Sequence, residues 1–202
     1  MDSLYIAPDG LARCRWTSGA PEFLAYHDNE WGYPVAVDQR LFEKLCLESF
    51  QSGLNWRTIL AKRENFRAAF QHFDFNLVAQ FTEKDVQQLL QNPGIIRHRG
   101  KIEAVINNAQ RAQEMVIQEG SLAAFFWRYE PKSLEASEAQ TLTTSAASIE
   151  IAKVLKKRGW KFVGPTTIFA FMQAMGLIND HVAGCCCRDK VEQTRQTFKR
   201  PG

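Results

Sequence analysis

The stretch KVLKKRGWKFVGPTTIFAFMQAMG, from Lys153 to Gly176, decides the fold of this chain. It predicts one helix that ends at Gly159 and a second helix that opens at Gly164, with a short hairpin between them. Glycine at both corners permits tight turns and a close approach of the backbone to another molecule. The unpaired N–H groups at the start of the second helix, together with the nearby lysines, suit a phosphate. An ordinary turn between two helices explains this stretch equally well, and under either interpretation we expect Phe162 and Val163 to be buried.

Outward from this stretch, apolar residues recur at helical spacing, and the alternation typical of strands is nearly absent. The sequence therefore predicts an all-α fold. We expect a single domain over 12–188, made of two interlocked helical lobes, with loosely held ends at 1–11 and 189–202 and a surface loop over 130–144. The predicted helical stripes are Leu41–Cys46, Val86–Leu90 after a capping box at Thr82–Asp85, Ile102–Ala109 and Ile149–Leu155.

Composition and the absence of targeting signals indicate the cellular location of the protein more clearly than they indicate what it binds. The chain has 202 residues, of which 45% are hydrophobic, and a formal net charge of only +3, so global charge alone does not indicate a nucleic-acid binder. Basic clusters usually form solvated surfaces, but the two clusters here, at 153–161 and 97–101, flank glycine-containing turns, which favours phosphate contact. Three of the five cysteines are consecutive, which argues against a disulfide framework. We see no secretory signal and no stretch of about 20 apolar residues, so a cytoplasmic location is the default expectation.

Two cysteines and two histidines form a possible metal site. His181 and Cys185 are four residues apart and would share one side of a helical turn, whereas Cys14 and His27 come from the far end of the chain. Two thiolates and two imidazoles suit tetrahedral zinc. From spacing alone this is a weak signal, because a lone histidine or cysteine is more often a core residue.

Glu48 lies in the segment CLESFQSGLNW, in the same helical column as Leu41 and Leu45. A carboxylate on an apolar face is costly unless it has a partner. That partner could be backbone or an arginine, which is the structural interpretation, or a cationic or donor-rich ligand. Aromatic residues of the same half of the chain, which are more often core, would offer faces to such a ligand: Trp16, Phe23, Tyr26, Trp31 and Trp56.

Taken together, these segments resemble the 3-methyladenine DNA glycosylase I family. The matching stretches include CRW, YHDNEWG, LFEKLCLE, GLNW, KRENFR, GIIRHRGKI, KKRGWKFVGPTT, FMQAMGLINDHV and GCC, which run from Cys14 to Cys187 and cover nearly the whole chain. YHDNEWG and IIRHRGKI are long and unusual, so chance similarity is improbable.

The resemblance implies a helix-hairpin-helix glycosylase fold in which a structural zinc joins the termini. It implies that Cys14, His27, His181 and Cys185 hold this zinc. It further implies that Glu48, as the catalytic carboxylate, shares the base pocket with Tyr26, Trp56, Phe23, Trp16 and Trp31. Two departures from the family pattern stand out. Phe23 replaces a tyrosine of several members, and Ser49–Phe50 replaces more polar residues ahead of the segment that we expect to wedge into the duplex: Gln51, Gly53 and Leu54.

The implied activity is base-excision repair: hydrolysis of the N-glycosidic bond of 3-methyladenine, with 3-methylguanine as a second candidate, after the nucleotide is flipped out of alkylated double-stranded DNA. Further DNA contacts are expected from the hairpin and its lysines: Lys157, Gly159, Lys161 and Gly164. We expect a monofunctional hydrolase without lyase activity, acting as a monomer with no membrane or protein partner. The alternatives are a non-enzymatic DNA-binding module, against which the carboxylate and aromatic residues argue, and a catalytic zinc hydrolase, against which four protein ligands argue.

Overall fold

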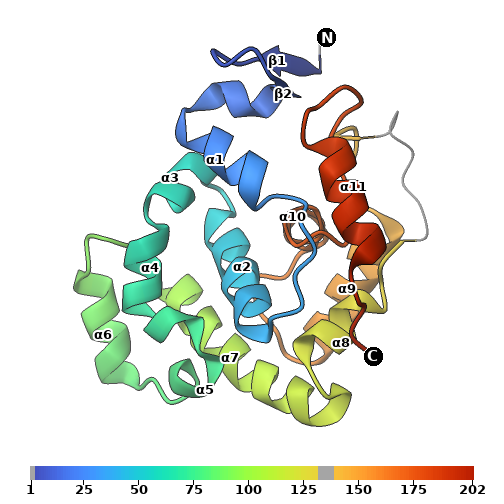
Figure 1. Ribbon diagram of the computed structural model, residues 1–202. Helices are drawn as coiled ribbons and strands as arrows, with labels where there is room; N and C mark the ends of the chain where they lie inside the picture. Colours follow the sequence, from blue (N-terminus) through green and yellow to red (C-terminus); the bar gives the residue numbers. More distant parts are fainter. Residues whose placement is uncertain (1–2, 132–138) are drawn as a thin grey trace.

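The computed structural model describes residues 3–131 and 139–202, and helices dominate this part of the chain (Figure 1). The predicted all-α class is therefore confirmed. The longer helices are α1 Glu22–Asn29, α2 Asp38–Gln51, α6 Glu83–Gln91, α7 Arg99–Glu119, α9 Ala146–Lys157, α10 Pro165–Ala174 and α11 Arg188–Thr197. The shorter ones are α3 Trp56–Ala61, α4 Arg63–Ala69, α5 Phe75–Val78, α8 Leu122–Trp127 and the 3-10 turns η1 Arg15–Gly19 and η2 Gln71–Phe73.

Helix α2 lies at the centre of the molecule, and the other helices surround it (Figure 1). It contacts α10, α7 and α8, and every residue from 41 to 50 is buried. These residues include the charged side chains of Glu43, Lys44 and Glu48. A helix that is covered on all sides cannot direct its charges to water, so each of them needs a partner inside the protein.

A cluster of phenylalanines packs beside α2 and accounts for one departure from the family pattern. The Phe50 ring lies 4.6 Å from the Phe66 ring, centroid to centroid, and the Phe70 ring stacks on those of Phe66 and Phe73. These four side chains are completely buried. Phe50 is therefore a core residue, and the packing of α2 against α4 explains why an apolar side chain occupies this position.

Several predicted helix boundaries are confirmed. Thr82 and Asp85 form the expected capping box at the start of α6. Pro165 occupies the first turn of α10, with Gly164 as its N-cap. Helix α9 ends just before Gly159, which has a φ of 83° that favours glycine. The helix, hairpin and second helix predicted from the 153–176 stretch are thus present in this order.

The two ends differ from the predicted boundaries of 12–188. Strand β1 (Leu4–Ile6) pairs with β2 (Ala12–Cys14) in a small antiparallel hairpin, in which Leu4 lies opposite Cys14. The backbone N–H of Cys186 donates to the carbonyl of Ala12, which joins β2 to the segment that leads into α11. The N-terminal hairpin and the start of α11 therefore lie side by side (Figure 1).

Helix α11 occupies most of the segment that we expected to be loosely held. Its sequence, RDKVEQTRQT, has a single apolar residue, Val191, and this side chain is fully buried. The buried Arg195 donates to the carbonyl of Gly176 and forms a 2.8 Å ion pair with Glu130. The helix is held by one apolar contact and by an arginine, which is why hydrophobic periodicity does not reveal it.

The predicted surface loop over 130–144 is only partly described, since 132–138 lie outside the described residues. Residues 139–144 form turns and bends without helix or strand. Within residues 3–131 and 139–202, no helix has both the length and the apolar character that crossing a membrane requires.

Gly176, just after α10, gives a test of this packing. Its φ is 75°, and a Cβ added there would lie 2.5 Å from the backbone of Tyr33 and Pro34. Gly176→Ala should lower the free energy of unfolding by about 2–5 kcal/mol, the sum of left-handed strain and overpacking. Gly120→Ala is the matched control, because Gly120 has a φ of 85° with nothing within 4 Å of the added Cβ, and it should cost only about 1–2 kcal/mol. Urea unfolding measures both; equal losses would contradict the close approach.

Candidate functional site

A cavity of about 410 Å³ opens between α1, α2, α3 and α10. Its wall contains all six residues that the sequence analysis assigned to a base pocket, although they come from η1, α1, α2, α3 and the turn after α1. The complete lining is Trp16, Phe23, Tyr26, Trp31, Glu48, Gln51, Asn55, Trp56, Gln140, Leu142, Ala170 and Gln173. A cavity of this size, lined by aromatic rings with a few polar groups, suits a small planar ligand.

The aromatic side chains contact one another. The Trp16 ring lies 5.6 Å from Phe23 and 5.3 Å from Trp31, both edge to face, and the Tyr26 ring lies 5.4 Å from Trp56 at an angle of 47°. Such contacts fix ring orientations and leave faces available for stacking. Phe23 carries no hydroxyl, so at this position the wall contributes area but no hydrogen bond.

Glu48 has a partner that the sequence analysis did not identify. Its Oε1 lies 2.7 Å from Nζ of Lys44, one turn earlier on α2, and both side chains are less than 8% exposed. The partner is therefore neither backbone nor an arginine, and the Glu48 carboxylate is not a lone anion awaiting a cation. A lysine four residues before a glutamate on the same predicted helix is the signal that would have revealed it.

Lys44 also touches two aromatic residues of the cavity wall. Its Nζ donates to the Tyr26 hydroxyl at 2.7 Å and lies 3.6 Å from the centre of the Trp56 ring. Burial lowers the pKa of Lys44 below its ordinary value, and the Glu48 carboxylate opposes this shift. Burial also raises the pKa of Tyr26 well above its ordinary value, and the charge of Glu48 adds to the effect. Tyr26 is therefore a neutral phenol that keeps its proton.

The sequence analysis missed several other residues that line the cavity. Gln140 and Leu142 belong to the loop over 130–144, and Gln173 belongs to α10. Asp180 joins them, since it accepts a hydrogen bond from the backbone N–H of Gln140 at 2.9 Å and another from Nε2 of Gln173 at 2.5 Å. Gln140 and Leu142 lie outside helices and strands and carry no periodic signal, so only a three-dimensional structure places them at the cavity.

The expected wedge segment follows directly from α2 at the mouth of the cavity. Gln51 lines the cavity, and Leu54 is 43% exposed. Lys101 supports this turn from beneath, because its Nζ donates to the carbonyls of Phe50 at 2.8 Å and Ser52 at 2.6 Å. Lys101 is therefore a structural residue, and the 97–101 cluster contributes less free positive charge than its composition suggests.

The hairpin after α9 is anchored to two neighbouring helices. The side-chain amide of Asn108 on α7 both accepts from the N–H of Lys161 and donates to its carbonyl, at 2.8 and 2.9 Å. The hydroxyl of Ser49 on α2 donates to the carbonyl of Phe162 at 3.0 Å and also lies 2.8 Å from the carbonyl of Leu45. Ser49, the other residue of the Ser49–Phe50 departure from the family pattern, thus joins the cavity helix to the hairpin.

The hairpin differs in two details from the prediction. Val163 is buried as expected, but Phe162 is 40% exposed, so the expectation of burial was wrong for this ring. Phe162 has a φ of 56°, whereas Gly164 has a φ of −70°, which any residue can adopt. The left-handed residue at the second corner is therefore Phe162, and this turn directs the ring outward.

The basic residues around the hairpin divide into free and paired groups. Lys157 and Lys161 are exposed. Arg158 is paired with Glu119, and Arg99 is paired with both Glu83 and Glu103 at 3.0 Å. The lysines of the hairpin thus remain available for an anionic partner.

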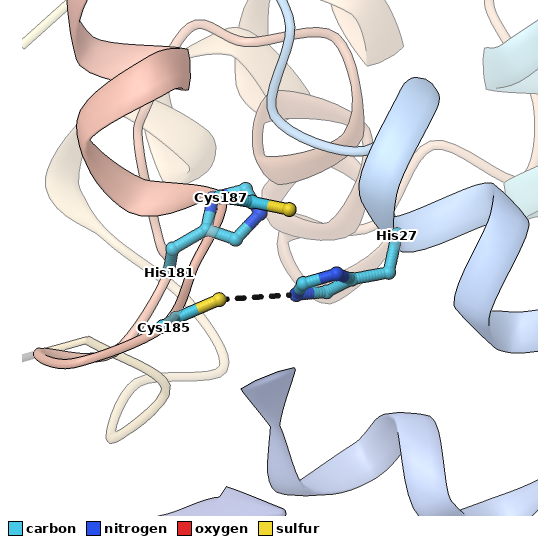
Figure 2. Close-up of side chains that lie close together, drawn as sticks. All are labelled: His27, His181, Cys185 and Cys187. Carbon is cyan, nitrogen blue, oxygen red and sulfur yellow. Dashed lines mark hydrogen bonds between the residues drawn. The ribbon is translucent and has the colours of Figure 1, made fainter. Parts of the chain in front are cut away.

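A second group of side chains could hold a metal ion. His27, His181, Cys185 and Cys187 are all buried, and their ligand atoms lie within 4.8 Å of one another (Figure 2). His27 comes from α1, and the other three come from the segment before α11. Three of the four predicted ligands are therefore brought together from opposite ends of the chain.

The donor set fits a metal ion. Nδ1 of His27 lies 2.8 Å from Asp28, and Nδ1 of His181 lies 2.9 Å from the side-chain oxygen of Asn179. These contacts leave the Nε2 lone pairs to face the centre of the group, as the outer partners of metal-bound histidines do. Nε2 of His181 is buried without a hydrogen-bond partner among the described residues. Burial, reinforced by His27, lowers the pKa of His181 to about 4, so this ring is neutral at pH 7.

Cys14, the fourth predicted ligand, lies at the edge of this group. It is fully buried at the end of β2, and hydrogen bonding with the Cys185 thiol raises its pKa. The same contact is the main reason why the pKa of Cys185 lies below its ordinary value. The described geometry thus offers two candidates for a fourth ligand, Cys14 and Cys187.

Comparison with known proteins identifies relatives along nearly the whole chain. The family described as methyladenine glycosylase matches residues 16–188. DNA-3-methyladenine glycosylase 1 of Escherichia coli (strain K12) is 49% identical over 181 residues, which cover 88% of this chain and 97% of that protein. DNA-3-methyladenine glycosylase of Haemophilus influenzae is 41% identical over 180 residues, covering 87% and 97%. A crystal structure of 3-methyladenine DNA glycosylase I shares 51% identity and superposes with a TM-score of 0.81, covering 87% and 99%.

Proposed function

Since the chain belongs to the methyladenine glycosylase family, we propose that it excises 3-methyladenine from alkylated double-stranded DNA by hydrolysing the N-glycosidic bond. The observation that carries the proposal is the cavity in which five aromatic rings surround one buried carboxylate, Glu48. A purine fits such a cavity once it has been flipped out of the duplex. A DNA-binding module without activity would need no cavity of this kind.

The chemistry demands little of the enzyme. N3-methylation gives the base a positive charge, so the base leaves as a neutral molecule and needs little acid catalysis. Trp56 stacks on the ring, Tyr26 and Glu48 hydrogen-bond to its edge, and water attacks the oxocarbenium-like sugar. Among the described residues no lysine lines the cavity, which supports hydrolysis without strand cleavage.

The hairpin between α9 and α10 binds the DNA backbone, as the hairpin of a helix-hairpin-helix protein does. The N–H groups at the start of α10, beside the exposed Lys157 and Lys161, bind phosphate without reference to sequence. Gly159 and Gly164 lie close to the backbone of the DNA, and Gln51, Gly53 and Leu54 fill the gap left by the flipped nucleotide. Ser49 supports this arrangement, because it ties the hairpin to the helix that carries Glu48.

A structural zinc joins the two ends of the chain. His27, His181 and Cys185 supply three ligands, and Cys14 supplies the fourth. Cys14 is preferred to Cys187 because the Cys187 thiol donates to the Asp28 carboxylate at 3.5 Å, where a thiolate would be repelled. With four protein ligands the metal has no open position for catalysis, so its contribution is to stability.

We further propose a cellular location, a macromolecular partner and an oligomeric state. The relatives are bacterial proteins, which supports action on DNA in the cytoplasm. Alkylated double-stranded DNA is the only macromolecular partner that the site requires, and a monomer contains every residue of the cavity. 3-Methylguanine is a second candidate substrate.

The decisive experiment measures release of free 3-methyladenine from alkylated DNA. Glu48→Gln keeps the shape of the side chain but removes its charge and one acceptor. Excision in single turnover should slow by about 10- to 100-fold, since hydrogen bonds to charged groups contribute about 1.5–3 kcal/mol. The loss stays partial because the substrate is already activated.

The matched control is Glu64→Gln, an exposed carboxylate on α4 that pairs with Arg67 and should leave excision unchanged. No release of base by the parent protein would reject the enzyme and favour a binding module. Parental activity in Glu48→Gln would make Glu48 a purely structural carboxylate.

The zinc proposal predicts about one zinc per chain by elemental analysis. Cys185→Ser and Cys14→Ser should lose the metal and lower the melting temperature, because binding stabilises only the folded state. Cys186→Ser is the control, since its side chain is exposed and outside the histidine group. Loss of zinc from Cys187→Ser but not from Cys14→Ser would reverse the assignment of the fourth ligand, and a stable metal-free parent would exclude the site.

If the hairpin binds the DNA backbone, the affinity for DNA should depend steeply on salt concentration and hardly on sequence. Replacing Lys157 and Lys161 together with alanine should weaken binding of undamaged duplex and reduce the salt slope by up to about one unit for each lost phosphate contact. Lys190→Ala, a lysine of α11 that lies over the Tyr33 ring, is the control. A parental slope in the double variant would place the DNA on another face.

A further inference from the structure

Lys44 is a buried charge next to the ligand cavity that the proposed chemistry does not use. It does not line the 410 Å³ cavity itself but a second, smaller cavity of about 130 Å³. The two cavities share Tyr26 and Trp56 as a common wall. Lys44 therefore lies behind the rings of Tyr26 and Trp56. Its ammonium group contacts the Glu48 carboxylate, the Tyr26 hydroxyl and the Trp56 ring.

The contact with Tyr26 sets the direction of one hydrogen bond. An ammonium group can only donate, so the Tyr26 oxygen must be the acceptor in the 2.7 Å contact with Lys44. Tyr26 keeps its own proton, because burial raises the pKa of the phenol. Among the described residues this proton has no acceptor, and Tyr26 lines both cavities. The hydroxyl is thus free to donate to a ligand in the larger cavity.

The contact with Glu48 determines which carboxylate oxygen remains available as an acceptor. Oε1 of Glu48 accepts from Lys44 at 2.7 Å, and the two charges neutralise each other. No other carboxylate lies within ion-pair distance of Lys44 in the described part of the chain, since the nearby Glu30 pairs with Arg63 and Arg40. The second oxygen of Glu48 has no other described partner and remains an acceptor at the cavity wall. Because the pair is neutral, the cavity distinguishes ligands by their hydrogen-bonding pattern and not by their charge alone.

We propose that Lys44 is a positioning residue that gives the cavity a fixed polarity, with Glu48 as acceptor beside Tyr26 as donor, and that this polarity selects the adenine ring over the guanine ring. Adenine presents an amine donor at N6 next to the acceptor N7, which complements this pattern. Guanine presents two acceptors, O6 and N7, so its oxygen would face the Glu48 carboxylate. The inference rests on the proposed function, since it concerns how the same cavity chooses between two methylated purines.

The test compares free 3-methyladenine with free 3-methylguanine by calorimetry on the full-length protein. Lys44→Met keeps the length of the side chain but removes its charge and all its donors. Its preference for 3-methyladenine should fall by about ten-fold or more, the change expected when one charge-assisted hydrogen bond loses its geometry. Lys44→Arg keeps the charge and the donors and should restore most of the preference. An unchanged preference in Lys44→Met, or equal losses in both variants, would overturn the proposal in favour of simple packing.

A measurement on the parent protein decides the matter if Lys44→Met does not fold. The ¹⁵N resonance of the Lys44 ammonium should move when 3-methyladenine is added, because the base shares Tyr26 and Glu48 with it. Lys101 is the matched control in the same spectrum, since it is equally buried but donates only to the carbonyls of Phe50 and Ser52. A static Lys44 signal in protein saturated with the base would overturn the proposal. A parent protein that neither binds nor excises 3-methyladenine would instead reject the proposed function.

Discussion

The complete burial of α2 is the constraint on which the rest of the molecule depends. Residues 41–50 are covered on every side, so each polar group on this helix is held by a specific internal contact. Lys44 and Glu48 neutralise each other, and Ser49 hydrogen-bonds to the hairpin. The carbonyls at the end of the helix accept from Lys101. The ligand cavity, the hairpin and the turn at residues 51–54 therefore share one rigid support, and a flipped base and the DNA backbone would be held in a fixed relation to each other.

A buried ion pair beside a ligand cavity contributes more to specificity than to stability. The loss of solvation on burial offsets much of the attraction between Lys44 and Glu48, so a pair of apolar residues would make the fold at least as stable. What apolar residues could not supply is a directed donor and a directed acceptor at the cavity wall. An arrangement that is costly for the fold but precise in geometry is expected where a protein must distinguish two ligands of similar shape.

Features that depend on interactions between residues close in sequence could be predicted, whereas features that depend on contacts between distant segments could not. Helix boundaries at Thr82, Pro165 and Gly159 were predicted correctly, because capping and turn chemistry act within a few residues. The cavity residues were gathered by resemblance and not by spacing, since Trp16, Glu48 and Trp56 come from elements that meet only in the folded chain. Two features were missed for physical reasons. Helix α11 is held by Val191 and by ion pairs, and Gln140 lies on a loop, so neither produces a hydrophobic period.

The metal group and the ligand cavity are linked through Asp180, the residue next to His181. The His181 ring lies beside the His27 ring, while the carboxylate of Asp180 holds Gln140 and Gln173 at the cavity wall. The His27 ring in turn stacks on Trp31, another wall residue, with centroids 6.1 Å apart. A metal that joins the ends of the chain would therefore also fix one side of the cavity, while α2 fixes the other. In this arrangement a structural ion could affect ligand affinity without touching the ligand, because it restricts the segments on which the wall is built.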